Sequence, residues 1–309
     1  MRLYRNAAIG ILRRAYARCL RWSDARAGRT RDDAGMTERE FRFGVVAGRA
    51  QTGGEWTATA RRAEELGYDI LLVPDTLHTL EPFAALAAAA AVTRTLRVGT
   101  YVLSVPNRAP GLVSWATESL QLISDGRFEL GLGGGRPGAE RDATALGRDF
   151  GTPADRLARV ADAVADARKL DDPPRILVAA SGPRMLRLAA ERADVVALGL
   201  PPQSTEPALA RAVETVRAAA GDRLDEIELH LNVAAVAPTV ESIPDWLSRM
   251  VGGDPRAMAA GGGIAFLTGS PERIADLLCR RREEFDVSYI GVSSLFMEEF
   301  APVLELLRS

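Results

Sequence analysis

A candidate anion-binding site lies in the segment 175–191, where an apolar strand pattern passes through small residues directly into a helical pattern. Ser181 and Gly182 allow a ligand to approach the backbone closely, and Pro183 presets φ at the first helical position. The free N–H groups and the helix dipole at such a corner favour a phosphate, and Arg184 beside it is a second candidate contact. The alternative is a well-capped turn between strand and helix, which every α/β protein needs.

Titratable candidates follow other predicted strands. Asp75 ends an apolar run, a position from which an acid can face a ligand and act in catalysis, although Asp after Pro commonly accepts hydrogen bonds from its own turn. For His78, an exposed loop histidine is the alternative to a catalytic one. His230 and Asn232 alternate within a later strand and share one face, so they either line the interior or satisfy each other's polar atoms.

The run from Gly133 to Gly138 matches G-x-G-x-x-G after a predicted strand, which is the pattern of dinucleotide binding. We reject that interpretation because Pro137 lies where the helix would begin and no hydrophobic helix opens in the next fifteen residues. The glycines instead indicate that the backbone approaches a flat ligand closely. Arg136 in this loop could contact a phosphate or carboxylate, although loop arginines are usually solvated.

The composition describes a globular protein without an excess of positive charge. The chain has 309 residues, of which 47% are hydrophobic and 26% charged, and a net charge of −2. This balance disfavours a nucleic-acid partner, and the longest apolar run, 83–92, is too short to span a membrane. Cys19, Cys279 and the two histidines lack the spacing of a metal site or a disulfide framework. We therefore expect no metal, and a reducing, cytoplasmic compartment.

Strand-like and helical patterns alternate from residue 41 onward. The predicted strands are 43–47, 69–75, 96–103, 127–132, 175–180, 194–199, 227–236 and 288–292. The predicted helices are 55–66, 82–92, 110–122, 153–170, 183–191, 206–220, 244–259, 271–284 and 297–307. Eight strand–helix units are what a closed (β/α)₈ barrel requires. A doubly wound sheet usually has fewer strands and a glycine fingerprint in its first unit, which is lacking here.

Residues 1–40 are rich in Arg and are excluded from the predicted barrel, which spans 41–309. We expect a poorly ordered extension there. It is either an amphipathic arm or targeting peptide, or the product of an upstream start codon with Met36 as the alternative start.

Seven short motifs, taken in order, make the chain resemble the bacterial luciferase-like monooxygenase superfamily, particularly its deazaflavin (coenzyme F420)-dependent oxidoreductases. The motifs lie at 41–44, 63–69, 73–75, 93–100, 122–133, 178–183 and 267–272. The resemblance runs from about 41 to 309 and implies a TIM barrel of the luciferase-like type.

The resemblance also implies a cofactor site. The N–H groups of Ala180–Gly182 would hold the phosphate of F420 or, alternatively, FMN. A bulge built on a non-prolyl cis peptide at Tyr101–Val102 would lie behind the ring. Ser104 and the Gly133–Gly134 backbone would bind the pyrimidine edge, and Asp75 would border the ring. The predicted cofactor-binding residues are Ala47, Asp75, Thr76, Tyr101, Val102, Ser104, Gly133, Gly134, Ala180, Ser181, Gly182 and Arg184.

Two departures from the family pattern concern this site. Thr76 occupies the position at which many deazaflavin members have a His acid/base, so we take Asp75 and His78 as the catalytic candidates. The connection between the fourth barrel helix and the fifth strand is shortened to 170–174, which removes part of the usual active-site wall.

Three functions follow as hypotheses. The first is hydride transfer between F420 and a small organic substrate with a C=C or C=N bond. The alternatives are an FMN-dependent monooxygenase supplied by a separate reductase, and a non-catalytic barrel that binds flavin or a partner. The family usually dimerises through its second and third helices. The Ala-rich helix 82–92 fits a homodimer, although tight packing on its own strands is the alternative.

Overall fold

The computed structural model describes residues 39–136 and 138–308. The extension predicted for residues 1–40 therefore lies almost entirely outside the described residues. Within the described ranges, no helix combines the length and apolar character needed to cross a membrane.

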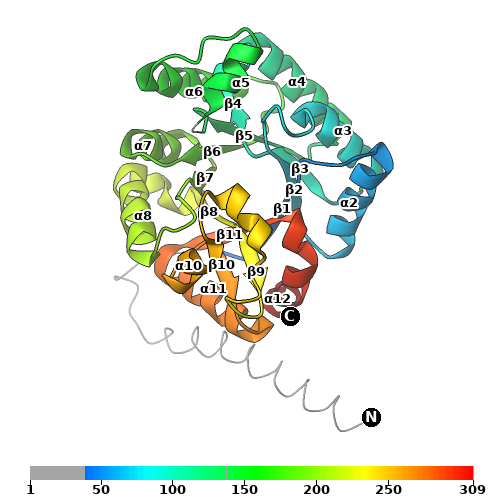
Figure 1. The fold of residues 1–309 in the computed structure, drawn as a ribbon. Helices are drawn as coiled ribbons and strands as arrows, with labels where there is room; N and C mark the ends of the chain where they lie inside the picture. The colour runs from blue at the N-terminus through cyan, green and yellow to red at the C-terminus, as the bar shows by residue number, and fades with distance from the viewer. Residues whose placement is uncertain (1–38, 137, 309) are drawn as a thin grey trace.

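Eight parallel strands close into a barrel with helices around it (Figure 1). The strands follow one another around the ring in chain order, and the last pairs with the first. They are β1 (Arg42–Val46), β2 (Ile70–Val73), β3 (Arg97–Thr100), β5 (Phe128–Gly133), β6 (Arg175–Ala180), β7 (Val195–Leu198), β8 (Glu228–Val233) and β11 (Val287–Ser293). The predicted (β/α)₈ fold is confirmed.

One helix of the outer ring lies between each pair of successive barrel strands, and the last follows β11. These helices are α2 (Gly53–Glu65), α3 (Pro82–Val92), α4 (Pro110–Ile123), α6 (Pro153–Ala167), α7 (Pro183–Arg192), α8 (Glu206–Ala220), α11 (Pro271–Phe285) and α12 (Met297–Arg308). Several begin with Pro in the first turn, where a missing N–H does no harm. Residues 168–174 lead from α6 directly into β6, which confirms the short connection.

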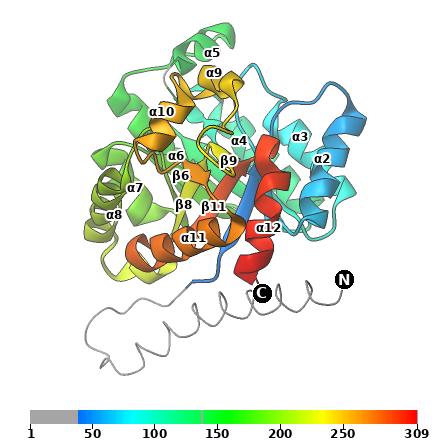
Figure 2. The same ribbon diagram turned by 60° about the horizontal axis from the view of Figure 1, so that its bottom comes forward.

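The smaller elements depart from the predicted boundaries. They are β4 (Leu103–Ser104), α5 (Ala139–Ala145), β9 (Ala235–Ala237), α9 (Ser248–Val251), α10 (Pro255–Ala260) and β10 (Phe266–Thr268). The strand predicted over 96–103 is interrupted after Thr100, and the one over 227–236 divides into β8 and β9. β9 pairs with β10 in a separate sheet. In Figure 2, α5, α9 and α10 lie together at one end of the barrel.

The predicted barrel helix 244–259 is wrong. Gly252, with φ of 75°, ends α9, and Pro255 begins the short α10. A left-handed residue and a proline cannot both lie inside one continuous helix. The barrel helix that follows β8 is α11. The segment between them forms an insertion at the carboxyl end of β8.

The core has two parts, divided by the barrel wall. Strand side chains that alternate outward form one large cluster with the helices, as expected for strands buried on both faces. The inward side chains form a small separate cluster inside the barrel: Ile70, Leu72, Leu177, Val195, Ala197 and Tyr289. Glycines 44 and 99 also face inward, where a Cβ would lie 3.1–3.2 Å from Ile70 and Leu72.

Carboxylates fix the turns at the amino end of the barrel. Glu64 Oε1 accepts hydrogen bonds from the N–H groups of Arg94, Thr95 and Leu96 at 2.7–2.9 Å, and this holds the turn between α3 and β3. These bonds outweigh the effect of partial burial and lower the pKa of Glu64 to about 2. Asp69 Oδ2 similarly accepts from Phe43 N at 2.7 Å, between β1 and β2. The motifs at 63–69 and 93–100 thus contain residues that fix strand starts.

The adjacent glutamates 64 and 65 allow a direct test of this turn. We expect Glu64→Ala to lower the free energy of unfolding by about 1–3 kcal/mol, because three backbone donors lose a charged acceptor. Glu65, whose side chain is 63% exposed and pairs with Arg62 at 3.3 Å, serves as the control. Its replacement by Ala should change stability by less than about 0.5 kcal/mol. Equal effects in urea unfolding would contradict this account.

Candidate functional site

The predicted bulge is present where β3 breaks from its neighbour β5. Gly99 pairs with Glu129 and Leu103 with Leu132, so residues 100–102 face only 130–131. The Thr100 hydroxyl replaces the lost ladder bonds, because it accepts from Gly131 N and donates to Gly131 O, both at 2.8 Å. The peptide between Tyr101 and Val102 is cis, as the family resemblance implied. An extra residue of this kind re-aims side chains at the rim of a barrel.

Glycines of β5 provide the space beside this bulge. A Cβ at Gly133 would lie 2.7 Å from Val102 Cγ2, and one at Gly131 would lie 2.0 Å from the Thr100 carbonyl oxygen. Only glycine fits at either position. The backbone of Gly134 continues toward α7, where its Cβ would lie 3.4 Å from Met185 Cε. The structure thus places the bulge, the Gly133–Gly134 backbone and the first turn of α7 at one end of the barrel.

The corner between β6 and α7 is open. Gly182 is the N-cap of α7, no side chain caps the helix, and its first turn contains no acidic residue. A Cβ added to Gly182 would meet nothing within 4 Å. Ala180 is buried, whereas Ser181 and Arg184 are exposed. The first-turn N–H groups are therefore open to an anion, and both the phosphate site and the plain strand–helix turn stay predictions.

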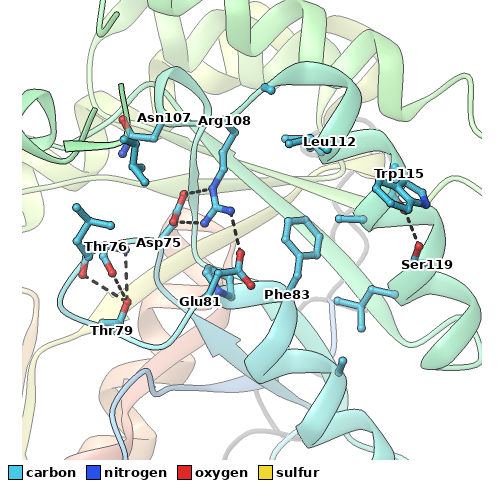
Figure 3. Close-up of a pocket in the computed structure, with 18 of the residues that line it drawn as sticks. Asp75, Thr76, Thr79, Glu81, Phe83, Asn107, Arg108, Leu112, Trp115 and Ser119 are labelled. Atoms are coloured by element: carbon cyan, nitrogen blue, oxygen red, sulfur yellow. Dashed lines mark hydrogen bonds and ion pairs between the residues drawn. The ribbon is translucent and has the colours of Figure 1, made fainter. Parts of the chain in front are cut away.

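Asp75 lies at the end of β2 and accepts from three donors, of which Figure 3 shows the two on Arg108. Its Oδ2 accepts from Ser104 N at 3.0 Å and from Arg108 Nε at 3.1 Å, while Arg108 Nη2 contacts Oδ1. Arg108 also pairs with Glu81 at 2.8 Å. Burial opposes the charge on Arg108, but both carboxylates raise its pKa. Asp75 thereby fixes the loop that follows the bulge, a contact that the sequence reasoning missed.

The other candidates near β1 and β2 are dispersed. The Ala47 side chain is buried in the outer core, and its N–H donates to Leu72 O at 2.9 Å. Thr76 contacts Thr79, with 3.4 Å between the hydroxyl oxygens. The His78 side chain is exposed. The structure therefore does not bring His78 and Asp75 together as an acid/base pair, and the catalytic role of His78 stays a prediction.

His230 and Asn232 both line the barrel interior. The exposed fraction of His230 is 0%, and its Nδ1 lies 3.3 Å from the Tyr101 hydroxyl. His230 Nε2 and Asn232 Oδ1 are buried and have no hydrogen-bond partner among the described residues. Of the two interpretations left open by the sequence, interior lining is correct, and mutual hydrogen bonding is wrong.

The loop after β5 leads into the short helix α5, although no helix was expected there. The first turn of α5 contains Glu140 and Asp142, whose charges disfavour a phosphate at that terminus. Arg136 is exposed and pairs with Asp142 at 3.4 Å. These features agree with rejection of a dinucleotide fingerprint. Within the described ranges, no group of three or more His, Cys, Asp or Glu residues could hold a metal ion.

A large apolar cavity lies outside the barrel, between α3 and α4 (Figure 3). It has a volume of about 740 Å³ and begins at Asp75 and Arg108. Its apolar lining includes Leu77, Phe83, Leu112, Val113, Trp115, Ile123 and Leu146. The cavity thus lies along the faces of the two helices that the sequence analysis associated with dimer formation.

The fold and the site define a class of protein: a parallel (β/α)₈ barrel whose third strand is interrupted by a cis-peptide bulge above a glycine-lined neighbour. Residues 40–170 match the profile of the luciferase-like monooxygenase family. Over this range the chain is similar to that family, in agreement with the motifs found in the sequence.

Known proteins are similar to the chain in sequence or in fold. The chain is 31% identical over 181 residues to a phthiodiolone/phenolphthiodiolone dimycocerosates ketoreductase of Mycobacterium sp. (strain JLS), covering 49% of this chain and 46% of that protein. It is 29% identical to the F420-dependent glucose-6-phosphate dehydrogenase of Nakamurella multipartita, covering 62% and 67%. The monooxygenase RslO1 of Streptomyces bottropensis shares the fold, with a TM-score of 0.67, 21% identity and coverage of 86% and 97%. The chain spans about half the length of the ketoreductase.

The buried His230 predicts a pH dependence of stability. Burial, together with the Arg42 charge, lowers its pKa to about 3. Between pH 6.5 and 4 the unfolded chain therefore binds a proton that the folded chain excludes. We expect this group to reduce the free energy of unfolding by up to about 1.4 kcal/mol per pH unit as the pH falls. Urea unfolding at several pH values should show a shallower slope for His230→Phe. His78→Phe, at the exposed histidine, should keep the wild-type slope; identical slopes in all three proteins would refute the assignment.

Proposed function

We propose that this protein is an oxidoreductase that transfers hydride between coenzyme F420 and a small organic substrate with a C=C or C=N bond. The observation that carries the proposal is the open, uncapped start of α7 next to the glycine-lined bulge of β3 and β5. A phosphate at the first and a flat ring at the second would fit one elongated cofactor. The relative named as an F420-dependent dehydrogenase supports the choice of F420.

The residues present fit such a cofactor. The Ser104 hydroxyl oxygen is buried without a hydrogen-bond partner among the described residues, and Ser104 lies two residues after Val102 of the bulge. We assign it, with the Gly133–Gly134 backbone, to the polar edge of the ring. The N–H groups of Ala180–Gly182 would hold the phosphate, with Arg184 beside it. A bound reduced deazaflavin supplies a hydride; the protein orients the two reactants and excludes water.

Acid/base chemistry is less well provided for. Asp75 borders the proposed ring site, but both of its carboxylate oxygens are engaged by donors. Thr76 has no group that titrates near neutral pH. We therefore propose that Asp75 positions the loop at Ser104 and Arg108, and that His78 is the remaining candidate acid/base, exposed at the rim.

An FMN-dependent monooxygenase is the second candidate, because the matching family profile is that of luciferase-like monooxygenases. The same phosphate corner and ring seat would serve FMN, with a separate reductase as partner. A barrel that binds flavin without turnover is the third. We also propose a cytoplasmic location and no nucleic-acid partner. The net charge of −2 is consistent with both.

Cofactor titrations separate these candidates. We expect the purified protein to quench the fluorescence of F420 at micromolar concentration and to bind FMN more weakly. Reduced F420 should then be oxidised by an activated alkene or imine at the same rate with and without oxygen. Tight FMN binding with oxygen-dependent turnover would favour the monooxygenase, and binding without turnover the third candidate. Binding of neither cofactor would overturn the proposal.

The phosphate corner can be tested by a charge placed before α7. Ser181→Asp should weaken binding of F420 at least about tenfold, because a carboxylate would repel the phosphate at the helix start. Binding of the phosphate-free deazaflavin riboside should be unchanged. Ser204→Asp, at the corresponding position before α8, provides the matched control. If both variants bind F420 like the wild type, the phosphate lies elsewhere.

We further propose a homodimer that buries α4. This helix buries polar side chains and exposes apolar ones. Thr117 and Gln121 are buried, whereas the side chains that are 60–80% exposed are Leu112, Trp115 and Leu122. Large exposed apolar patches mark interaction sites. The cavity between α3 and α4 lies on the same face, and a second copy of the chain would cover both.

Charge substitutions test the dimer. Trp115→Glu should convert a dimer into a monomer at micromolar concentration, measured by sedimentation velocity, because an unpaired carboxylate would be buried at the interface. Trp246→Glu, at a second exposed tryptophan of the described residues, which lies on the insertion after β8, should leave the mass unchanged. A monomeric wild-type protein would contradict the proposal.

A further inference from the structure

A continuous stack of polar and aromatic side chains occupies the barrel interior. The Arg42 guanidinium lies 4.5 Å from the centre of the Tyr289 ring. The rings of Tyr289 and His230 meet edge to face at 4.4 Å, and those of His230 and Tyr101 lie 4.9 Å apart. The side chains come from β1, β11 and β8 and from the residue directly after β3. The stack ends at Tyr101, the middle residue of the bulge at 100–102.

The lower end of this stack is fixed by ion pairs. Arg42 contacts Glu129 at 2.7 Å and Glu228 at 2.6 Å, and the side chains of both glutamates are almost completely buried. Arg97 and Arg175 provide the second partners of these glutamates, at 2.6 and 2.9 Å. Four strands other than β1 are thereby tied to the base of the stack, so that Arg42 has little freedom to move.

The side chains of the stack fill the space left by two glycines and pack closely against them. A Cβ at Gly291 would lie 2.6 Å from His230 Nε2, and one at Gly44 would lie 3.2 Å from Tyr289 Cε2. His230 is completely buried, and its ring is held between Tyr101 and Tyr289. The imidazole can therefore act on the bulge only through Tyr101.

We propose that His230 is a positioning residue for the cofactor ring, a role that rests on the proposed function. Through the 3.3 Å contact between its Nδ1 and the Tyr101 hydroxyl, it fixes the Tyr101 side chain inside the barrel. The next residue, Val102, then fills the space over the Gly131 and Gly133 backbone, beside the proposed ring seat. A loose Tyr101 would allow Val102 to move into that seat.

His230 acts here as a neutral spacer and a hydrogen-bonding group. Tyr101, Tyr289 and the Arg42 guanidinium are the titratable or charged groups that face it, from the bulge, β11 and β1. None of these groups is a carboxylate, which would favour protonation of the imidazole. The nearby carboxylates, Glu129 and Glu228, form ion pairs with arginines instead. The imidazole is thus set to hold a position and not to exchange protons with a substrate.

The test is a double-mutant cycle read by cofactor affinity. Tyr101→Phe removes only the hydroxyl, and His230→Phe keeps a ring of similar width without the Nδ1 group. We expect each to weaken F420 binding about three- to tenfold, and the double variant to bind no more weakly than either single one, because both remove the same bond. The visible circular dichroism of bound F420 should change in parallel, since the ring environment is altered.

Tyr68→Phe is the matched control. The Tyr68 hydroxyl donates to Met297 O at 2.9 Å in the outer core, so its loss should lower the melting temperature and leave F420 affinity unchanged. Gly291→Ala, whose Cβ would displace His230, should reproduce the loss of affinity, and it covers the case in which His230→Phe does not fold.

The outcomes are distinct. Wild-type affinity in Tyr101→Phe and His230→Phe, with only a lower melting temperature, would overturn the positioning role and leave the proposed function intact. Additive losses in the double variant would also overturn it. A wild-type protein that binds neither F420 nor FMN would instead fail the proposed function itself, and the positioning role with it.

Discussion

The site depends on one side chain that takes the place of backbone hydrogen bonds. The Thr100 hydroxyl donates to the C=O of Gly131 and accepts from its N–H, at 2.8 Å each. A closed barrel needs every strand to pair on both sides, and the extra residue in 100–102 would otherwise leave two buried backbone groups without partners. With that demand met, the chain can turn Tyr101 into the interior and place Val102 over the β5 glycines. The proposed ring seat thus lies at an interruption that the barrel tolerates because the Thr100 hydroxyl replaces the missing backbone partners.

Around this interruption the two ends of the barrel are built differently. The amino end is closed by charged groups that bind backbone starts and one another, among them Glu64, Asp69 and the Arg42 ion pairs. The carboxyl end has a helix start without a side-chain cap, and a carboxylate, Asp75, that fixes a loop. The Ser104 hydroxyl at this end has no hydrogen-bond partner among the residues that the structure describes. Rigid closure at one end allows accessible donors at the other, which is where TIM barrels place their chemistry.

The alternation of strand-like apolar runs with helical patterns was enough to predict eight strands and the barrel that they form. Parallel strands buried on both faces are recognisable in a sequence as nearly continuous apolar runs. Motif order located the bulge. Two errors had local causes: glycine and proline at 252–255 divide a helix that periodicity alone joins, and α5 forms without a hydrophobic stripe. The Asp75–Arg108 contact was missed because a loop arginine gives no sign of its partner. The stack through His230 was inaccessible to sequence reasoning, since it depends on the register of strands far apart in the chain.

The ion pairs at the closed end of the barrel use arginine throughout. The chain has a single lysine, Lys169, in the exposed turn that follows α6. A guanidinium keeps its proton at any pH that a protein survives. Alkaline solution therefore leaves the cationic half of this network charged. Because arginine has no reactive amine, reagents that acylate or cross-link amines have almost no target in the barrel. Such reagents would label Lys169 and any free amino terminus, and leave the strand network as it was.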